Sequence, residues 1–166
     1  MTRRGAARTA GLAEALGVAA AIAAAVAAVL GLGACGGGLP GPAELDTRNE
    51  ACSWCRMGVS DRRFAAQLVA PSEEPRFFDD LGCLAAYLSG KEPPRGALVF
   101  VADHRTKGWV PGRSAVYTRV DGLATPMGSH LVAHADAASR DADPDARGGV
   151  GAPVPPGLPG LPEGTR

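Results

Sequence analysis

The sequence predicts a small α+β domain over residues 48–138, in which two strands, a helix and a third strand form a ββαβ-type unit. Three observations lead to this prediction. Residues 64–69 and 76–78 are apolar runs of strand length on either side of a Pro-rich turn. Apolar residues recur at intervals of three and four over residues 81–88, as on one face of a helix. Residues 97–101 form a continuous, partly β-branched apolar run, which is typical of a buried strand.

The helix predicted over residues 81–88 has recognisable ends. Asp79 or Asp80 precedes it, and either carboxylate can accept a hydrogen bond from the unpaired N–H groups of the first turn. Gly90 and Pro93 follow it, and both residue types commonly end helices. The helix therefore connects the second and third strands of the unit.

The second half of the chain has weaker patterns. Residues 109–110 and 115–120 are expected to be strands, and residues 131–139 a short closing helix. Residues 141–166 contain six Pro and six Gly and no aromatic residue. Because such a segment cannot bury enough apolar area to offset its ordering entropy, residues 139–166 are predicted to be a disordered tail.

The amino-terminal end has the layout of an export signal. Three arginines within the first eight residues precede twenty uncharged, mainly apolar residues, 15–34, a length that could also span a bilayer. Leu32-Gly33-Ala34-Cys35 resembles a bacterial lipobox. Residues 1–34 are therefore predicted to be a lipoprotein signal peptide, Cys35 the lipidated residue, and residues 35–47 a flexible spacer. Gly36 follows the cysteine, so inner-membrane retention is not signalled, and we expect a membrane-anchored protein facing the periplasm, with outer-membrane placement plausible.

The charge of the remaining chain argues against a nucleic-acid partner. Three of the 17 Lys and Arg residues and one of the 17 Asp and Glu residues precede Cys35, which leaves a net charge of 14 − 16 = −2. No cluster of basic residues larger than Arg62-Arg63 follows the signal. A protein that binds DNA or RNA needs a basic surface to displace counterions from the phosphates.

The densest group of possible metal ligands is Cys52-Ser53-Trp54-Cys55-Arg56-Met57. Two thiols and a thioether are soft donors that suit copper(I), and an extended or turning backbone can bring a Cys-x-x-Cys pair onto one ion. Met57 would lie on the same side of an extended strand as Cys55. The other candidate ligands along the chain are Cys83, His104, Met127, His130 and His134.

Each of these ligands also has a simpler interpretation. Cys-x-x-Cys in an exported protein is often a structural disulfide, and Cys83 is interpreted first as a small buried apolar side chain. Met127 is more often core filler than ligand, although it lies between Pro and Gly in a turn. His104 is expected to be solvated in a loop. His130 and His134, four residues apart, would share one exposed helix face.

Three chemistries compete for the thiol pair. A structural zinc site needs four ligands, and no second pair at a matching distance accompanies the first except His130 and His134. Thiol–disulfide exchange needs the pair at a helix start after a strand, but no apolar strand precedes Cys52, although Thr125-Pro126 resembles part of a thioredoxin-like site. Copper(I) alone would use the methionines. With neither a Gly-x-Ser-x-Gly elbow nor a phosphate loop, we do not expect an enzyme.

Together the motifs resemble the NosL family of lipoproteins, over about residues 48–135. The segments that carry the resemblance are Cys52-x-x-Cys55-x-Met57, Asp61-Arg62-Arg63-Phe64-Ala65-Ala66-Gln67, Phe77-Phe78-Asp79-Asp80-Leu81-Gly82-Cys83-Leu84, Val99-Phe100-Val101-x-Asp103, Gly108-Trp109, Ala115-x-Tyr117 and Thr125-Pro126-Met127-Gly128. Arg56 stands where the family commonly has Gly, and this bulkier residue is expected to narrow the loop conformations available before Met57.

The resemblance implies a function and a fold. The implied fold has paired ββαβ units, similar to those of organomercury lyase. The implied function is a copper(I) chaperone that helps assemble the copper–sulfide centre of nitrous oxide reductase, with an ABC-type maturation complex and the reductase itself as partners. The expected ligands are Cys52 and Cys55, then Met57 and Met127, with Cys83 and His130 completing the set.

Overall fold

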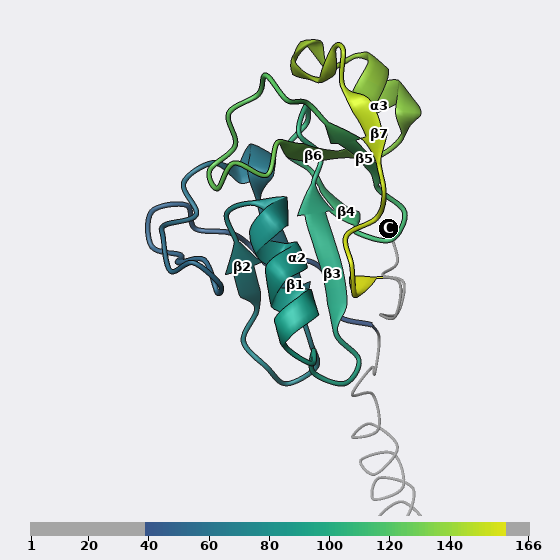
Figure 1. The fold of residues 1–166 in the computed structure, drawn as a ribbon. Helices are drawn as coiled ribbons and strands as arrows, with labels where there is room; N and C mark the ends of the chain where they lie inside the picture. Colours follow the sequence, from purple (N-terminus) through teal and green to yellow (C-terminus); the bar gives the residue numbers. More distant parts are fainter. Residues whose placement is uncertain (1–38, 159–166) are drawn as a thin grey trace, which may run out of the picture. The chain divides into compact units, whose positions relative to one another are not determined.

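The computed structural model describes residues 39–158, which form a mixed α and β domain with two antiparallel sheets (Figure 1). The elements in chain order are η1 (Arg62–Phe64), β1 (Ala66–Val69), β2 (Arg76–Phe78), α2 (Leu81–Gly90), β3 (Leu98–Ala102), β4 (Trp109–Pro111), β5 (Val116–Arg119), β6 (Leu131–His134), α3 (Ala137–Asp141), η2 (Pro144–Ala146) and β7 (Val150–Ala152). The predicted α+β class and the strand–strand–helix–strand order of the first half are confirmed.

The first sheet has the strand order β2-β1-β3-β4. Gln67 at the middle of β1 is paired with Phe77 on one side and Phe100 on the other. Helix α2 packs against β1 and β2, and it covers one face of this sheet in Figure 1. All five residues of β3 are buried, as its continuous apolar run predicts. This packing fixes the end of β2 and the start of α2.

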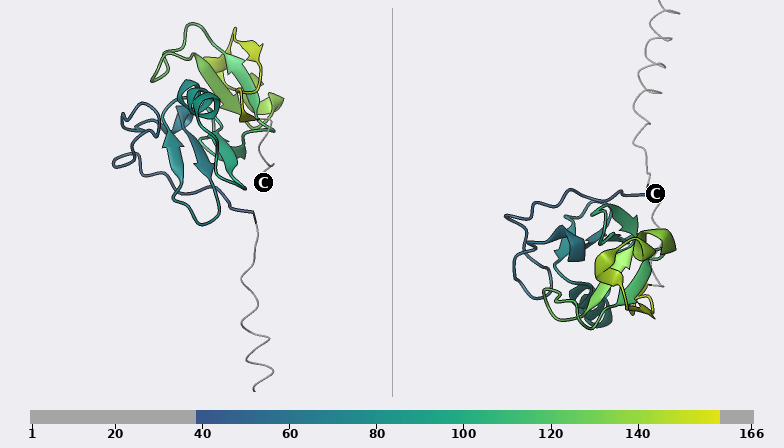
Figure 2. Two further views of the ribbon diagram at one scale, coloured as in Figure 1. Left: turned by 60° about the horizontal axis from the view of Figure 1, so that its bottom comes forward. Right: turned by 90° about the horizontal axis from the view of Figure 1, so that it is seen from above.

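The second sheet has the order β6-β5-β7 and lies beyond the carboxyl end of β3 (Figures 1 and 2). A parallel bridge between Asp103 and Ala133 joins the two sheets at this point. The predicted closing helix over residues 131–139 is wrong in its first half, because Leu131–His134 is strand β6 and pairs along β5. Only the short helix α3 falls in the expected place.

The prediction of a disordered tail is wrong for residues 139–158. Strand β7 pairs with β5, so partners elsewhere in the chain satisfy its backbone groups. Leu158 is fully buried in the main hydrophobic core. Tertiary contacts therefore order this segment, although its composition alone would not.

The second half of the predicted spacer is also packed on the domain. The side chain of buried Gln67 accepts a hydrogen bond from the Ala43 N–H at 2.7 Å and donates one to the Ala43 carbonyl at 3.1 Å. Leu45 belongs to the main core. The predicted signal peptide and the lipidation site Cys35 lie outside the described residues. Within the described segment, neither α-helix has the length and apolar character needed to cross a bilayer.

Leu158→Ala tests whether the carboxyl-terminal segment belongs to the folded domain. Removing a fully buried leucine side chain should lower the free energy of unfolding by roughly 2–5 kcal/mol, measured by urea denaturation. Leu39, which is half exposed, provides the control, and Leu39→Ala should change stability little. Equal, small effects of the two substitutions would show that residue 158 does not pack in the core.

Candidate metal centre

The Cys52–Met57 loop is a tight turn fixed by backbone hydrogen bonds. The N–H of Cys52 donates to the Met57 carbonyl at 2.7 Å, and the N–H of Arg56 donates to the Cys52 carbonyl at 3.0 Å. The N–H of Ser53 donates to the Phe77 carbonyl at 2.8 Å, which ties the loop to strand β2. Cys52 and Cys55 are thereby held beside the end of β2.

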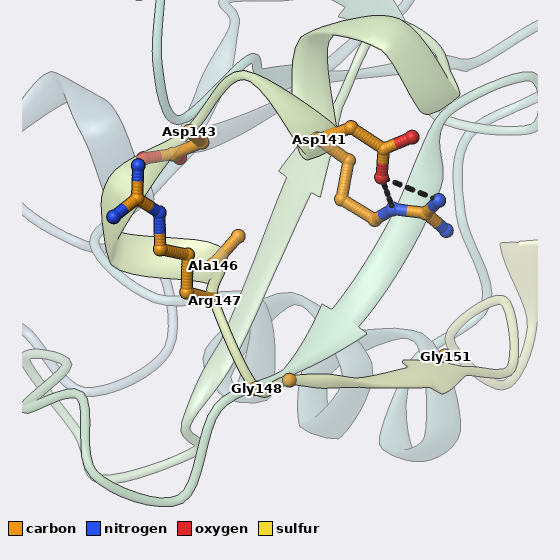
Figure 3. Close-up of a pocket in the computed structure, with 8 residues that line it drawn as sticks. Asp141, Asp143, Ala146, Arg147, Gly148 and Gly151 are labelled. Atoms are coloured by element: carbon orange, nitrogen blue, oxygen red, sulfur yellow. Dashed lines mark hydrogen bonds and ion pairs between the residues drawn. The ribbon is translucent and has the colours of Figure 1, made fainter.

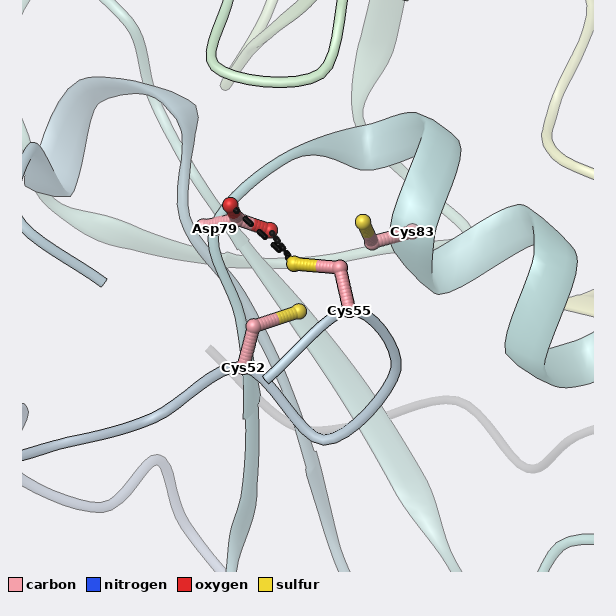
Figure 4. A group of neighbouring side chains, drawn as sticks. All are labelled: Cys52, Cys55, Asp79 and Cys83. Atoms are coloured by element: carbon pink, nitrogen blue, oxygen red, sulfur yellow. Dashed lines mark hydrogen bonds between the residues drawn. The ribbon is translucent and has the colours of Figure 1, made fainter. Parts of the chain in front are cut away.

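Asp79 and Cys83 come from the junction of β2 and α2. Asp79 follows the last residue of β2, and Asp80 is the N-cap of α2, where its carboxylate accepts from the Gly82 N–H at 2.6 Å. Cys83 is the third residue of the helix. The start of α2 therefore carries a carboxylate and a thiol toward the Cys52–Met57 loop (Figure 4).

These four side chains form one cluster of possible metal ligands. The Sγ atoms of Cys52, Cys55 and Cys83 and a carboxylate oxygen of Asp79 all lie within 4.8 Å of one another. The Cys55 Sγ is 3.5 Å from each carboxylate oxygen of Asp79. Cys52, Asp79 and Cys83 are buried, whereas Cys55 is partly exposed. We call this group the thiol cluster.

The three cysteines in the described part of the chain are free thiols. Burial raises the pKa of Cys52 and of Cys83, and hydrogen bonding to Asp79 raises both further. The proximity of Cys52 adds to the shift at Cys83. Both thiols therefore carry protons at neutral pH, and a metal must displace those protons when it binds.

The donor set suits two kinds of metal ion. Three thiolates satisfy copper(I), while three thiolates and a carboxylate supply the four ligands that zinc prefers. Redox chemistry fits less well, because Cys52 and Cys55 lie in a turn and not at the start of a helix.

Comparison of the whole chain with family models, curated proteins and solved structures finds no match. The resemblance to the NosL family therefore depends on the sequence motifs alone.

The two methionines expected as ligands lie at the surface. Met57 is 57% exposed and Met127 is 46% exposed. The Met127 N–H donates to the Asp80 carboxylate at 3.0 Å, so its loop is tied to the start of α2 next to Asp79. Both thioethers are thus accessible to solvent, Met57 on the loop that holds Cys52 and Met127 on a loop tied to Asp80 beside the cluster.

His130 has a different environment. Its side chain is partly buried, and its Nδ1 atom lies 2.9 Å from the Leu123 carbonyl oxygen, to which it donates. One ring nitrogen is therefore occupied by a backbone partner, and only Nε2 is left for a metal.

Sequence reasoning missed Asp79 and assigned Cys83 first to the core. The sequence signal for Asp79 was present, because Asp79-Asp80 contains one more carboxylate than a helix cap requires. Cys83 is buried as expected, but its sulfur also joins the cluster. Two other expectations are corrected: His104 is buried, not solvated, and His134 lies at the end of β6, not on a helix.

Arg56 adopts the left-handed backbone region, with φ of 70°. Only Gly enters this region without a steric penalty. The backbone of Arg56 is therefore strained, in line with the expectation that Arg narrows the conformations available to this loop. Arg56→Gly should relieve it and raise the free energy of unfolding by roughly 1 kcal/mol, measured by chemical denaturation. Arg147 has an ordinary φ of −63°, so Arg147→Gly should lower stability instead. A loss of stability on both substitutions would contradict strain at Arg56.

Metal binding to the thiol cluster should weaken as the pH falls. The raised pKa values of Cys52 and Cys83 mean that each thiol holds a proton that the metal must displace, and protons become harder to displace at lower pH. Affinity for zinc(II), measured by chelator competition between pH 6 and 8, should rise with pH by at least about tenfold per unit. In Cys83→Ala one fewer proton is displaced, so the slope of the logarithm of zinc affinity against pH should fall by about one. A pH-independent affinity would rule out these thiols as ligands.

Proposed function

We propose that this chain is a copper(I) metallochaperone that carries its ion on Cys52, Cys55 and Cys83. The observation that supports this proposal best is the convergence of three free thiols from two distant segments of the chain. Copper(I) is satisfied by two or three soft donors, and thiolates are its preferred ligands. A site of this kind holds copper(I) without needing a fourth protein ligand.

The partial exposure of the cluster suits a carrier rather than a permanent structural site. Cys55 is accessible at the rim, and the exposed side chains of Trp54 and Met57 lie on the same loop. An incoming thiolate or imidazole from a partner can therefore approach the ion from the side of Cys55. Thioethers are neutral and bind more weakly than thiolates, so Met57 and Met127 are suited to hold the ion briefly during transfer.

Asp79 has a separate role in this proposal. A carboxylate is a hard donor and a poor ligand for copper(I). Its oxygens lie 3.5 Å from the Cys55 sulfur, so Asp79 accepts a hydrogen bond from the thiol and orients that side chain before metal binds. The same carboxylate favours a second candidate, a zinc-binding structural lipoprotein, because it would complete a four-ligand Cys₃Asp site.

The cellular setting is proposed from the sequence motifs. Export, lipidation at Cys35 and a position facing the periplasm follow from the lipobox-like junction. Delivery to the copper–sulfide centre of nitrous oxide reductase, through an ABC-type maturation complex, follows from the NosL resemblance. We therefore place the carrier on a membrane surface, where it would hand copper(I) to exported copper proteins.

Ligand substitutions distinguish copper transport from zinc binding. Reduced protein is titrated without oxygen against a chromophoric copper(I) chelator, and separately against a zinc chelator. Cys52→Ala, Cys55→Ala and Cys83→Ala should each weaken copper(I) binding strongly, and Met127→Ala should weaken it less. Asp79→Asn should leave copper(I) affinity almost unchanged but lower zinc affinity by roughly 10–100-fold.

Two results would contradict the copper assignment. Unchanged copper(I) affinity in the Cys52→Ala, Cys55→Ala double variant would move the site elsewhere. A large loss of copper(I) affinity in Asp79→Asn would favour the zinc-type site in which the carboxylate is a ligand. Asp121, an exposed carboxylate paired with Arg119, provides the matched control, and Asp121→Asn should affect neither metal.

A further inference from the structure

A second polar cluster lies at the junction of the two sheets. His104 follows β3, His134 ends β6, and Asp143 lies between α3 and η2. The Nδ1 atom of His104 is 2.7 Å from one carboxylate oxygen of Asp143, and the Nε2 atom of His134 is 2.9 Å from the same oxygen. All three side chains are almost completely buried.

The backbone around this triad is held firmly. The His104 N–H donates to the Ala133 carbonyl at 2.8 Å, next to the bridge between Asp103 and Ala133. The Asp103 carboxylate accepts from the Ala135 N–H at 2.8 Å and from the Ser139 hydroxyl at 2.6 Å. These bonds fix the ends of β3 and β6 and the start of α3, so the two imidazoles are positioned before any ligand arrives.

The hydrogen bonding of the triad is incomplete within the protein. Both rings donate to one oxygen of Asp143, and its other oxygen accepts from the Asp145 N–H at 3.0 Å. The remaining nitrogens, Nε2 of His104 and Nδ1 of His134, are buried and have no partner among the described residues. A buried ring nitrogen without a partner is unusual, because the lost hydration is not replaced. Two buried polar atoms of the cluster therefore make no hydrogen bond within the described part of the protein.

We propose that His104, His134 and Asp143 bind a divalent cation of the zinc(II) class, at a site separate from the thiol cluster. Two imidazoles and a carboxylate are borderline and hard donors, a set that suits zinc(II) and not copper(I). When the ion binds Nδ1 of His104 and Nε2 of His134, each neutral ring carries its proton on its other nitrogen, Nε2 of His104 and Nδ1 of His134. Ligand atoms of a tetrahedral zinc ion lie about 3.3 Å apart, so the two contacts need to open by only about half an ångström.

A surface cavity borders this site on the side of Asp143. The cavity has a volume of about 430 Å³, and its lining includes Asp143 together with Arg140, Ala146 and Gly149 (Figure 3). Asp143 thus contacts both the cavity and the two histidines. An ion can approach along this side, and a water molecule there can take the fourth position that three protein ligands leave open. This site would bind its ion whether or not the thiol cluster carries copper.

The test uses the full chain in detergent with all four cysteines changed to Ala, which removes every thiol ligand. After dialysis against zinc(II), elemental analysis should find one zinc per chain. Cobalt(II) in the same protein should give the visible absorption of a four-coordinate ion without thiolate charge-transfer bands. Asp143→Asn in this background should weaken zinc binding about 100-fold, while Asp121→Asn, an exposed carboxylate paired with Arg119 outside the cavity, should not change it.

A folded cysteine-free chain that binds no zinc would overturn the proposal and leave the triad as a structural hydrogen-bond network. A second measurement avoids reliance on variants. In the unaltered chain labelled with ¹⁵N-histidine, two equivalents of zinc should shift the Nδ1 resonance of His104 and the Nε2 resonance of His134. If neither nitrogen responds, the triad is not a metal site.

Discussion

The buried carboxylate of Asp80 fixes the start of α2, beside Asp79 and Cys83 of the thiol cluster, and ties it to the Thr125–Met127 loop. It caps α2 through the Gly82 N–H, and it accepts from the Thr125 hydroxyl at 2.7 Å and from the Met127 N–H at 3.0 Å. Burial alone would raise the pKa of Asp80, but the hydrogen bonds, with Ser129 contributing as well, outweigh burial and lower it. The group therefore remains an anion at neutral pH. Its charge fixes the helix start and, through it, the positions of Asp79 and Cys83.

This arrangement separates two tasks between neighbouring carboxylates. Both carboxylate oxygens of Asp80 already accept hydrogen bonds from the protein. Asp80 therefore stabilises the helix start and is not available as a metal ligand. Asp79 interacts with the thiols of the cluster itself, because its carboxylate accepts from Cys55 and its hydrogen bonding raises the pKa of Cys52 and Cys83. Asp80 caps the helix, and Asp79 contacts the thiols. The two adjacent aspartates at this helix start therefore have different partners.

The two polar clusters differ in the metal chemistry that they offer. The thiol cluster is soft and has a partly exposed rim at Cys55, which favours exchange with a partner. The His104–His134–Asp143 triad is harder, more deeply buried and placed between the sheets, which favours a retained ion that stabilises the fold. A chain with both would carry one ion as cargo and keep the other, and their unlike donors would limit exchange between them.

Local patterns in the sequence were sufficient for the strand–strand–helix–strand order, the Asp cap and the thiol pair. Each of these depends on residues within one or two turns of one another, so spacing alone predicts them. The remaining features depend on distant partners. Asp79 is 24 residues from Cys55, and Asp143 is 39 residues from His104, so only the tertiary structure brings each pair together. Strand β7 and Leu158 are ordered by β5 and the core, since burial against distant residues supplies the free energy that a Pro- and Gly-rich segment lacks by itself.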